Sequence, residues 1–214
     1  MDSMRKPFCR KFVFVLLFVF VATCCFISPA AASLQEYMTK HRGIQVTREQ
    51  QKRLSDYEDL ITYFCSFSFF EPRHKVNPDF IRALILAESN CKSKALSDKN
   101  ARGLTQIIYT TGKQAARELV EKDLHFEYVS KEQLRQLKPE DLYKPEVNIL
   151  LSCYLVAKYN YQNKGKLDLV VSAWNAGEYS ITDNKPAQYK ETLNHIGKVN
   201  GYFIDLLNNK ESAN

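Results

Sequence analysis

Glu88 is the residue whose place in the sequence best suits acid–base chemistry. The segment before it, 80 to 87, is apolar on nearly every side of a helix, which predicts a helix that runs through the core. Apolar surroundings disfavour the charged form of a carboxyl group, so Glu88 can hold a proton near neutral pH and act as a general acid. A Glu at a helix end is more often an exposed terminus, so position alone leaves both interpretations open.

Five segments carry motifs that follow one another in a consistent order. The first is Ala87-Glu88-Ser89-Asn90, which an Asn-Pro helix start and an apolar helix precede. The other four are Ala101-Arg102-Gly103-Leu104-Thr105-Gln106, Pro145-Glu146-Val147-Asn148-Ile149 with Cys153-Tyr154-Leu155, Ser172-Ala173-Trp174-Asn175-Ala176-Gly177, and Glu191-Thr192-Leu193-Asn194-His195-Ile196. On these motifs, over roughly residues 57 to 207, the chain resembles the soluble lytic transglycosylases.

The resemblance implies an all-α, lysozyme-like transglycosylase domain in which Glu88 is the catalytic residue and faces a glycan groove. Enzymes of this family cleave peptidoglycan between MurNAc and GlcNAc. Glu88 would protonate the leaving oxygen and then remove the proton of the MurNAc 6-hydroxyl, which closes a 1,6-anhydro ring. The substrate's acetamido group would stabilise the positive charge. Hydrolysing lysozymes commonly use two carboxylates, and no second carboxylate in these motifs suits the role of nucleophile.

Three polar residues match substrate-binding positions of the family. Gln106 matches a groove glutamine, whose amide can both donate and accept hydrogen bonds. Asn175 matches a groove-lining asparagine, and Ser97 matches a serine near the catalytic Glu. Each also has a structural interpretation: a polar residue at a helix start for Gln106, a brace of the following turn for Asn175, and an ordinary loop serine for Ser97.

Four residues depart from the family pattern. Thr105 and Ile108 stand where methionines are frequent, which would reshape the groove wall. Trp174 replaces a common Tyr; it keeps a flat face for a sugar ring and one N–H donor, but it cannot accept a hydrogen bond. His195 stands where a Tyr often supplies a hydroxyl near the Glu. We expect both rings to bind substrate, although a protonated His195 would favour the charged form of Glu88.

No cofactor or metal site is expected. The sequence has no CxxC pair, and its four histidines do not cluster: His41, His74, His125 and His195. Cys65, Cys91 and Cys153 remain beyond the first 32 residues. A disulfide is plausible in an exported chain, with Cys91 and Cys153 the preferred pair because both lie beside the motifs. Three buried free thiols are an equally good explanation.

Helical periodicity extends over most of the chain, and Gly and Pro are sparse at seven each, so we predict few or no strands. Thr47 and Gln50 form a capping box that starts a helix with one apolar stripe: Leu54, Tyr57, Ile61 and Phe64. The aromatic run that follows packs against the core or forms a membrane or partner surface: Phe67, Phe69 and Phe70. Asn77 caps the helix that Pro78 begins.

Further helices are expected at 109–121, 131–137, 145–159, 167–174 and 189–207, with a loop at 89–102. The stretch between Ile108 and Val147 is charged and less apolar, so we interpret it as a peripheral insertion. We expect an N-terminal extension and the start of the first helix at 33–56, a transglycosylase domain at 57–207 and a tail at 208–214.

The first 32 residues have the pattern of an export signal. Four basic residues precede an apolar run from 12 to 27, whose 16 residues fall short of the roughly 20 that span a bilayer. Ala30-Ala31-Ala32 fits cleavage before Ser33. A retained anchor and a lipid attached at Cys24 are the alternatives. We therefore expect an exported protein, periplasmic or associated with the cell envelope, that meets the membrane only through this signal.

Removal of this segment would lower the net charge of +6 to +3, which is too small to indicate nucleic-acid binding. Peptidoglycan strands are the expected partner, and an envelope-spanning secretion or conjugation machine is a candidate by analogy. Two other functions remain open. One is a hydrolytic muramidase or chitinase on the same scaffold, and the other is a catalytically weak glycan-binding protein, for which Trp174 and His195 are the best support.

Overall fold

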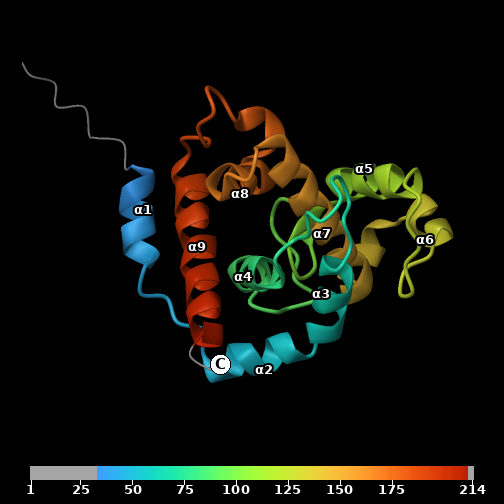
Figure 1. Cartoon of the computed structure of the whole chain (residues 1–214), viewed down its shortest axis with the longest axis horizontal. Coiled ribbons are helices and arrows are strands. Elements are labelled where there is room, and N and C mark those ends of the chain that lie inside the picture. The colour runs from blue at the N-terminus through green and yellow to red at the C-terminus, as the bar shows by residue number, and fades with distance from the viewer. Residues whose placement is uncertain (1–32, 212–214) are drawn as a thin grey trace, which may run out of the picture. The chain divides into compact units, whose positions relative to one another are not determined.

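The computed structural model describes residues 33–211, and the predicted export signal lies outside them. This part of the chain is almost entirely helical (Figure 1). The α-helices are α1 Leu34–His41, α2 Arg48–Ser55, α3 Glu58–Cys65, α4 Pro78–Glu88, α5 Tyr109–Val120, α6 Lys131–Arg135, α7 Pro145–Gln162, α8 Leu167–Ala176 and α9 Lys190–Glu211. Two short 3₁₀ helices, Pro139–Tyr143 and Glu178–Ser180, connect them. None of the helices within 33–211 is long and apolar enough to cross a bilayer.

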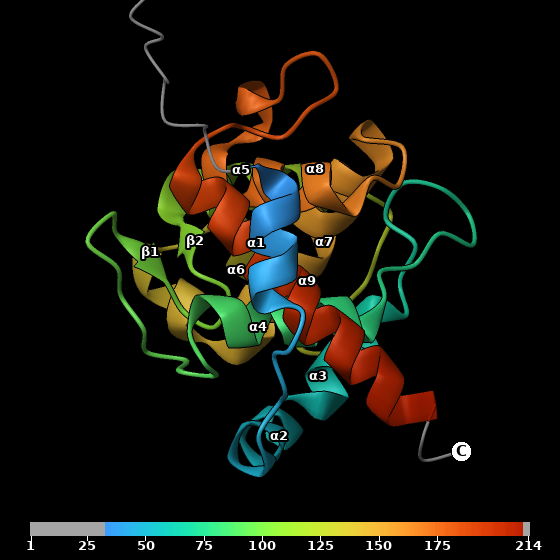
Figure 2. The same ribbon diagram turned by 90° about the vertical axis from the view of Figure 1, so that its left-hand side faces the viewer.

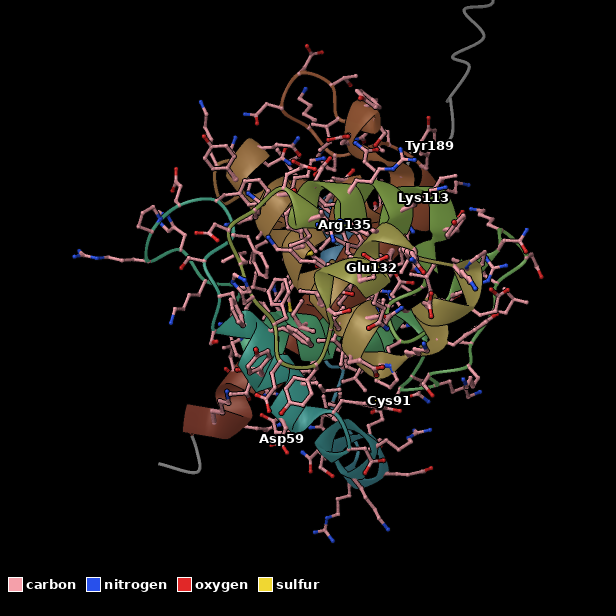
Figure 3. The ribbon with its side chains drawn as sticks, turned by 90° about the vertical axis from the view of Figure 1, so that its right-hand side faces the viewer. Asp59, Cys91, Lys113, Glu132, Arg135 and Tyr189 are labelled. Atoms are coloured by element: carbon pink, nitrogen blue, oxygen red, sulfur yellow. The ribbon has the colours of Figure 1, made fainter. Side chains whose placement is uncertain are left out.

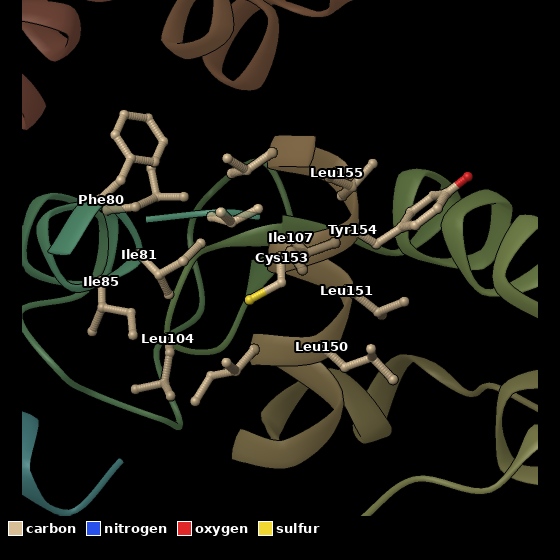
Figure 4. Packing of buried hydrophobic residues seen from close by; sticks show 14 of the residues in the cluster. Phe80, Ile81, Ile85, Leu104, Ile107, Leu150, Leu151, Cys153, Tyr154 and Leu155 are labelled. Atoms are coloured by element: carbon tan, nitrogen blue, oxygen red, sulfur yellow. The ribbon is translucent and has the colours of Figure 1, made fainter. Parts of the chain in front are cut away.

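Helix α4 runs through the middle of the core, as its sequence predicts. The Asn77 side chain accepts a hydrogen bond from the Asp79 N–H at 2.8 Å, and Pro78 occupies the first helical position. Every residue from Asp79 to Ala87 is buried. Figure 4 shows side chains of α4, such as Ile81 and Ile85, packed in the same buried layer as those of α7. The apolar helix therefore carries Glu88 to the end of the core.

A two-stranded hairpin follows the loop after α4. Strand β1, Ala101–Arg102, pairs antiparallel with β2, Ile107–Ile108. Gly103 has φ of 81°, and a Cβ there would lie 2.1 Å from the carbonyl oxygen of Leu142. Only glycine fits this close approach, which explains its place in the second motif. Few strands were expected, and these are the two that residues 33–211 contain.

The predicted single helix with one apolar stripe is two helices. The capping box of Thr47 and Gln50 forms as expected, but α2 ends at Ser55 and α3 begins at Glu58 (Figure 1). No Gly or Pro marks this corner. Gln50 and Arg53 of α2 donate hydrogen bonds to the Asn90 side chain, whereas α3 packs against α7. The two helices thus bind different partners, which a local pattern does not reveal.

Helix α1 lies in the predicted N-terminal extension and crosses α9 (Figure 2). Two glycines one turn apart on α9 make the contact. A Cβ on Gly197 would lie 2.5 Å from the Tyr37 carbonyl oxygen, and one on Gly201 would lie 2.4 Å from that of His41. Because a side chain at either position would push α1 away, α1 is a packed part of this domain. Helix α9 ends at Glu211, beyond the expected end at 207.

The stretch between Ile108 and Val147 is not a peripheral insertion as a whole. Helix α5 packs against α7, and its Ala115, Ala116 and Leu119 are buried in the core. Because Ala115 and Ala116 are small, α5 can pack closely against α7 although its other faces carry charged residues. The outward face of α5 and α6 carries exposed charges, among them Lys113, Glu132 and Arg135 (Figure 3). The prediction therefore holds for this outer face alone.

All three cysteines of the described chain are free and buried. The preferred pair of Cys91 and Cys153 is wrong, because the sulfur close to Cys153 is that of Cys65, 3.7 Å away. Cys153 lies on α7 and Cys65 at the end of α3, and these helices pack together. Burial raises the pKa of the Cys91 thiol to about 11. Proximity to the motifs did not show which face of α7 carries Cys153.

Candidate active site

Glu88 is the last residue of α4, and its side chain is 15% exposed. The Ser89 N–H bonds the Ile85 carbonyl and ends the helix. Asn90 and Cys91 then take positive φ of 52° and 66°, so the chain leaves the helix axis abruptly. Such left-handed conformations cost about 1–2 kcal/mol for a residue with a Cβ, and the hydrogen bonds from α2 to Asn90 help to hold the turn. Glu88 is therefore fixed at a helix end that points out of the core.

The Glu88 carboxylate opens into a cleft of about 380 Å³. The cleft brings together four of the five predicted substrate-binding residues: Ser97, Gln106, Trp174 and Asn175. Its walls also include apolar side chains from β2 and α7, among them Ile107, Ile108 and Leu155. Segments far apart in the sequence therefore converge on one carboxylate, as the motif order predicted.

Trp174 forms a hydrogen bond with the Glu88 carboxylate. Its indole Nε1–H donates a hydrogen bond to Oε1 of Glu88 at 2.8 Å. A donor to a carboxylate favours the charged form of that carboxylate. Trp174, which replaces the Tyr common in the family, thus still supplies a hydrogen-bond donor, and its ring lines the cleft.

His195 approaches the same oxygen without a hydrogen bond. Its Nε2 lies 3.2 Å from Oε1 of Glu88. This nitrogen is buried and, within residues 33–211, has no partner in hydrogen-bonding geometry. His195 lies beside Glu88 as expected, although it is not among the residues that line the cleft. Both close contacts go to Oε1, and neither involves Oε2.

The other three predicted residues brace the cleft walls. The Gln106 amide donates to the carbonyl oxygens of Gly103 at 2.9 Å and Ala95 at 3.2 Å, and Gln106 has φ of 54°. Asn175 accepts a hydrogen bond from the Thr192 hydroxyl at 2.8 Å, which ties α8 to α9. The Ser97 hydroxyl accepts from the Ala101 N–H at 3.0 Å. Ser97 thus holds its own loop, as its structural interpretation had it, whereas Gln106 lies in the hairpin turn and not at a helix start, and Asn175 binds α9 and not the turn that follows it. All three residues line the cleft.

A buried network behind the hairpin escaped prediction. The side-chain oxygen Oδ1 of Asn148 accepts hydrogen bonds from the Thr105 N–H at 3.0 Å and from the Thr105 hydroxyl at 2.7 Å. The Thr105 and Ser152 hydroxyls lie 2.6 Å apart. Thr105, where methionine is frequent in the family, thus supplies hydroxyl contacts to α7. The signal was available, since Thr105 and Asn148 both belong to motifs.

Charged residues around the cleft were also missed. Lys99 of the loop and Glu191 of α9 line the cleft and form an exposed ion pair at 3.2 Å. Asp98 is a second carboxylate in the lining. Lys198 lies one turn beyond His195, and its ammonium donates to the Ala87 carbonyl oxygen at 2.6 Å. The i, i+3 spacing from His195 would have placed Lys198 on the same face of α9.

Comparisons with known proteins agree with the geometry. The family model of the transglycosylase SLT domain matches residues 67–196. The 70 kDa soluble lytic transglycosylase SLT70 of Escherichia coli has a similar fold, with a TM-score of 0.59 at 16% identity over 83% of this chain. An inactive Glu-to-Gln mutant of the lytic transglycosylase Slt of Pseudomonas aeruginosa gives 0.52 at 18% identity over 84%.

The chain covers 33% of the length of each of these two proteins. No curated protein matches the chain at a significant level. At these identities the two structural likenesses concern the fold. Together with the family match they confirm the all-α transglycosylase fold that the motifs predicted.

Proposed function

Because the chain belongs to the transglycosylase SLT domain family, we propose that it is a peptidoglycan lytic transglycosylase with Glu88 as acid and then base. One observation supports the proposal: Glu88 ends a buried helix and lines a cleft, where the Trp174 N–H donates to its Oε1 and His195 Nε2 lies 3.2 Å from the same oxygen. We infer that Oε2, to which no hydrogen bond is made within residues 33–211, meets the substrate. Ser97, Gln106, Trp174, Asn175 and His195 would position the glycan around this carboxyl.

In the proposed reaction Glu88 begins protonated and gives its proton to the glycosidic oxygen between MurNAc and GlcNAc. The C1–O bond breaks, and the leaving GlcNAc takes the proton and the bonding electrons. Glu88, now a carboxylate, accepts the proton of the MurNAc 6-hydroxyl as that oxygen bonds to C1. The products are a GlcNAc hydroxyl and a 1,6-anhydro-MurNAc end, and Glu88 is protonated again.

The contacts of Glu88 suit both halves of this cycle. A carboxylate forms when the proton leaves, and the Trp174 N–H already points at the oxygen that then carries charge. A donor placed in advance needs no reorganisation during the reaction, which is the main source of electrostatic catalysis. General acid and base catalysis by one positioned carboxyl contributes about 100- to 10,000-fold each.

The proposed location follows from the substrate. Residues 1–32 would direct export, so that the mature chain acts on peptidoglycan in the periplasm or cell envelope. The domain that acts there would be 57–207 together with α1, since α1 packs on α9. An envelope-spanning secretion or conjugation machine remains a candidate partner that would direct the cleavage to one place.

Asp98 gives the hydrolytic alternative a specific basis, because it is a second carboxylate in the cleft lining. A hydrolase would use it as nucleophile or as the base that activates water. Product analysis separates the reactions. Digestion of purified sacculi with the mature protein, followed by mass spectrometry, should give muropeptides with 1,6-anhydro ends.

The Asp98→Asn variant is the matched test of the alternative. The proposal expects the same anhydro products from this variant at a rate within a few-fold of the wild type. Reducing ends from the wild-type protein, lost in Asp98→Asn, would move the assignment to hydrolysis. No soluble product from the wild type would instead favour a glycan-binding protein.

A further inference from the structure

Lys198 is a cation withdrawn from solvent beside the proposed catalytic residue. It is half-buried on α9, and its hydrogen-bond partner is the Ala87 carbonyl oxygen at 2.6 Å. Within residues 33–211 no carboxylate forms an ion pair with it, although the charge of Glu88 acts on it. Lysines usually extend their ammonium group into water. The hydrogen bond from Lys198 to a main-chain carbonyl oxygen therefore needs a physical explanation.

The end of α4 gives that reason. Ala87 lies in the last turn, where helix carbonyls have no N–H of the helix to bond. These carbonyls carry the negative end of the helix dipole, worth about half an elementary charge. Glu88 follows directly, so its carboxylate would form beside a partial negative charge and against an apolar core. The Lys198 ammonium offsets the partial negative charge of the Ala87 carbonyl and brings a positive charge to the helix end that carries Glu88.

We propose that Lys198 is a positioning residue that remains charged and sets the pH range in which Glu88 releases its proton. This inference rests on the proposed function, because it assigns a purpose to the proton of Glu88. The two charges support one another. Burial lowers the pKa of Lys198, whereas the neighbouring Glu88 raises it.

The other titratable groups around Glu88 have a weaker or a different influence on its charge. Asp98, Lys99 and Glu191 line the cleft but are exposed, and the last two pair with each other, so water and salt screen them. Tyr159 faces the cleft from α7, and burial raises its pKa to about 12, so it is neutral at working pH.

On the far side of α9, Lys40 and His41 of α1 bind the Asn194 side chain and not the cleft. His195 is the remaining neighbour withdrawn from solvent. In general a lysine ammonium keeps its charge to a much higher pH than an imidazole does, because the reference pKa values are about 10.4 and 6.5. Lys198 is therefore the fixed positive charge at this site.

The sign of the effect follows directly. Removal of the positive charge disfavours the carboxylate, so Glu88 should keep its proton to a higher pH. Because the charges of Lys198 and Glu88 act on one another, we expect the titration midpoint of Glu88 to rise by about one pH unit when the ammonium is removed. The high-pH loss of cleavage, where the acid is deprotonated, should move upward by the same amount.

Three substitutions separate charge from hydrogen bonding. Lys198→Arg keeps both the charge and a donor to Ala87, Lys198→Gln keeps a donor without the charge, and Lys198→Met keeps neither. Lys190→Met, an exposed lysine at the start of the same helix, controls for the loss of one positive charge. Thermal unfolding of each variant identifies any that does not fold. If only one of Lys198→Gln and Lys198→Met folds, that variant is compared with the wild type and with Lys198→Arg.

The measurement is the titration of the Glu88 carboxyl carbon by NMR in the full mature chain, with Glu88→Gln used to assign its signal. We expect a midpoint about one pH unit higher in the Gln and Met variants and a wild-type midpoint in the Arg and Lys190→Met variants. Equal midpoints in all four would overturn the inference and leave Lys198 a structural cap of α4. Because this titration needs no activity, it decides the role of Lys198 even if Glu88→Gln were to cleave peptidoglycan and so refute the proposed function.

Discussion

The two ends of α4 each carry a carboxylate, and their surroundings differ in kind. At the start of the helix Asp79 is 4% exposed and forms ion pairs with Arg82 and with Lys210, the latter at 2.8 Å. Arg82 also binds Glu58 of α3. At the other end Glu88 is 15% exposed. Within residues 33–211 its side chain accepts one hydrogen bond, from the neutral indole of Trp174, and the nearby Lys198 donates to the Ala87 carbonyl oxygen instead.

This difference suggests that the carboxylates at the start of α4 stabilise the fold, whereas the carboxyl at its end is the one available for the proposed chemistry. Burial opposes the charge of Glu58, but the hydrogen bonds and charge of Arg82 outweigh it and hold the pKa of Glu58 below its ordinary value. A carboxylate held by cations in this way remains charged and anchors the helix. Within residues 33–211 no lysine or arginine forms an ion pair with Glu88, which distinguishes it from Glu58 and Asp79. Helix α4 therefore has a carboxylate paired with two cations at its start, and at its end the carboxyl for which we propose the chemistry.

Arg82→Met should have the largest effect on stability. It leaves Glu58 without its cation and Asp79 with Lys210 alone, and breaking a buried ion pair from one side costs about 3–5 kcal/mol. The Tm should fall by roughly 10 °C, measured by circular dichroism. Arg135→Met, which removes an exposed ion pair with Glu132 on α6, is the control and should change little. A Tm equal to that of the wild type would show that the start of α4 is not the anchored end.

Trp174→Phe should have the next effect, on catalysis and not on folding. The change keeps a flat ring in the cleft but removes the N–H that bonds Oε1 of Glu88. Hydrogen bonds to a charged group contribute about 1.5–3 kcal/mol, which corresponds to a roughly 10- to 100-fold loss of kcat/KM. Turbidity clearing of sacculi measures it, with the exposed Tyr179→Phe as control. An undiminished rate would mean that Glu88 needs no donor from the indole.

The sequence predicted what depends on local pattern and on motif order. The cap at Asn77, the apolar α4 and the placement of Glu88 at its end all follow from residues within one segment. The convergence of Gln106, Trp174 and His195 on Glu88 came from the family resemblance, because contacts between distant segments have no local signal.

The errors arose where distant partners decide the structure. Helix α1 has no buried residue of its own, and its packing depends on Gly197 and Gly201 of α9. Its capping box of Ser33 and Glu36 was a local signal that could have revealed it. The corner between α2 and α3, and the approach of Cys65 to Cys153, depend on which helix lies opposite. Lys198 was missed because its partner is a main-chain carbonyl, which no side-chain motif records.

The most direct test of the account is the cleavage rate of Glu88→Gln beside that of Asp79→Asn on the same sacculi. Each change replaces a carboxylate by an amide of nearly equal shape, at opposite ends of one helix. We expect Glu88→Gln to lose at least about 100-fold of the release of 1,6-anhydro muropeptides while its Tm stays close to that of the wild type. Asp79→Asn should show the reverse, a lower Tm with near wild-type cleavage below that Tm. Cleavage by Glu88→Gln at the wild-type rate would contradict the central claim that Glu88 performs the chemistry.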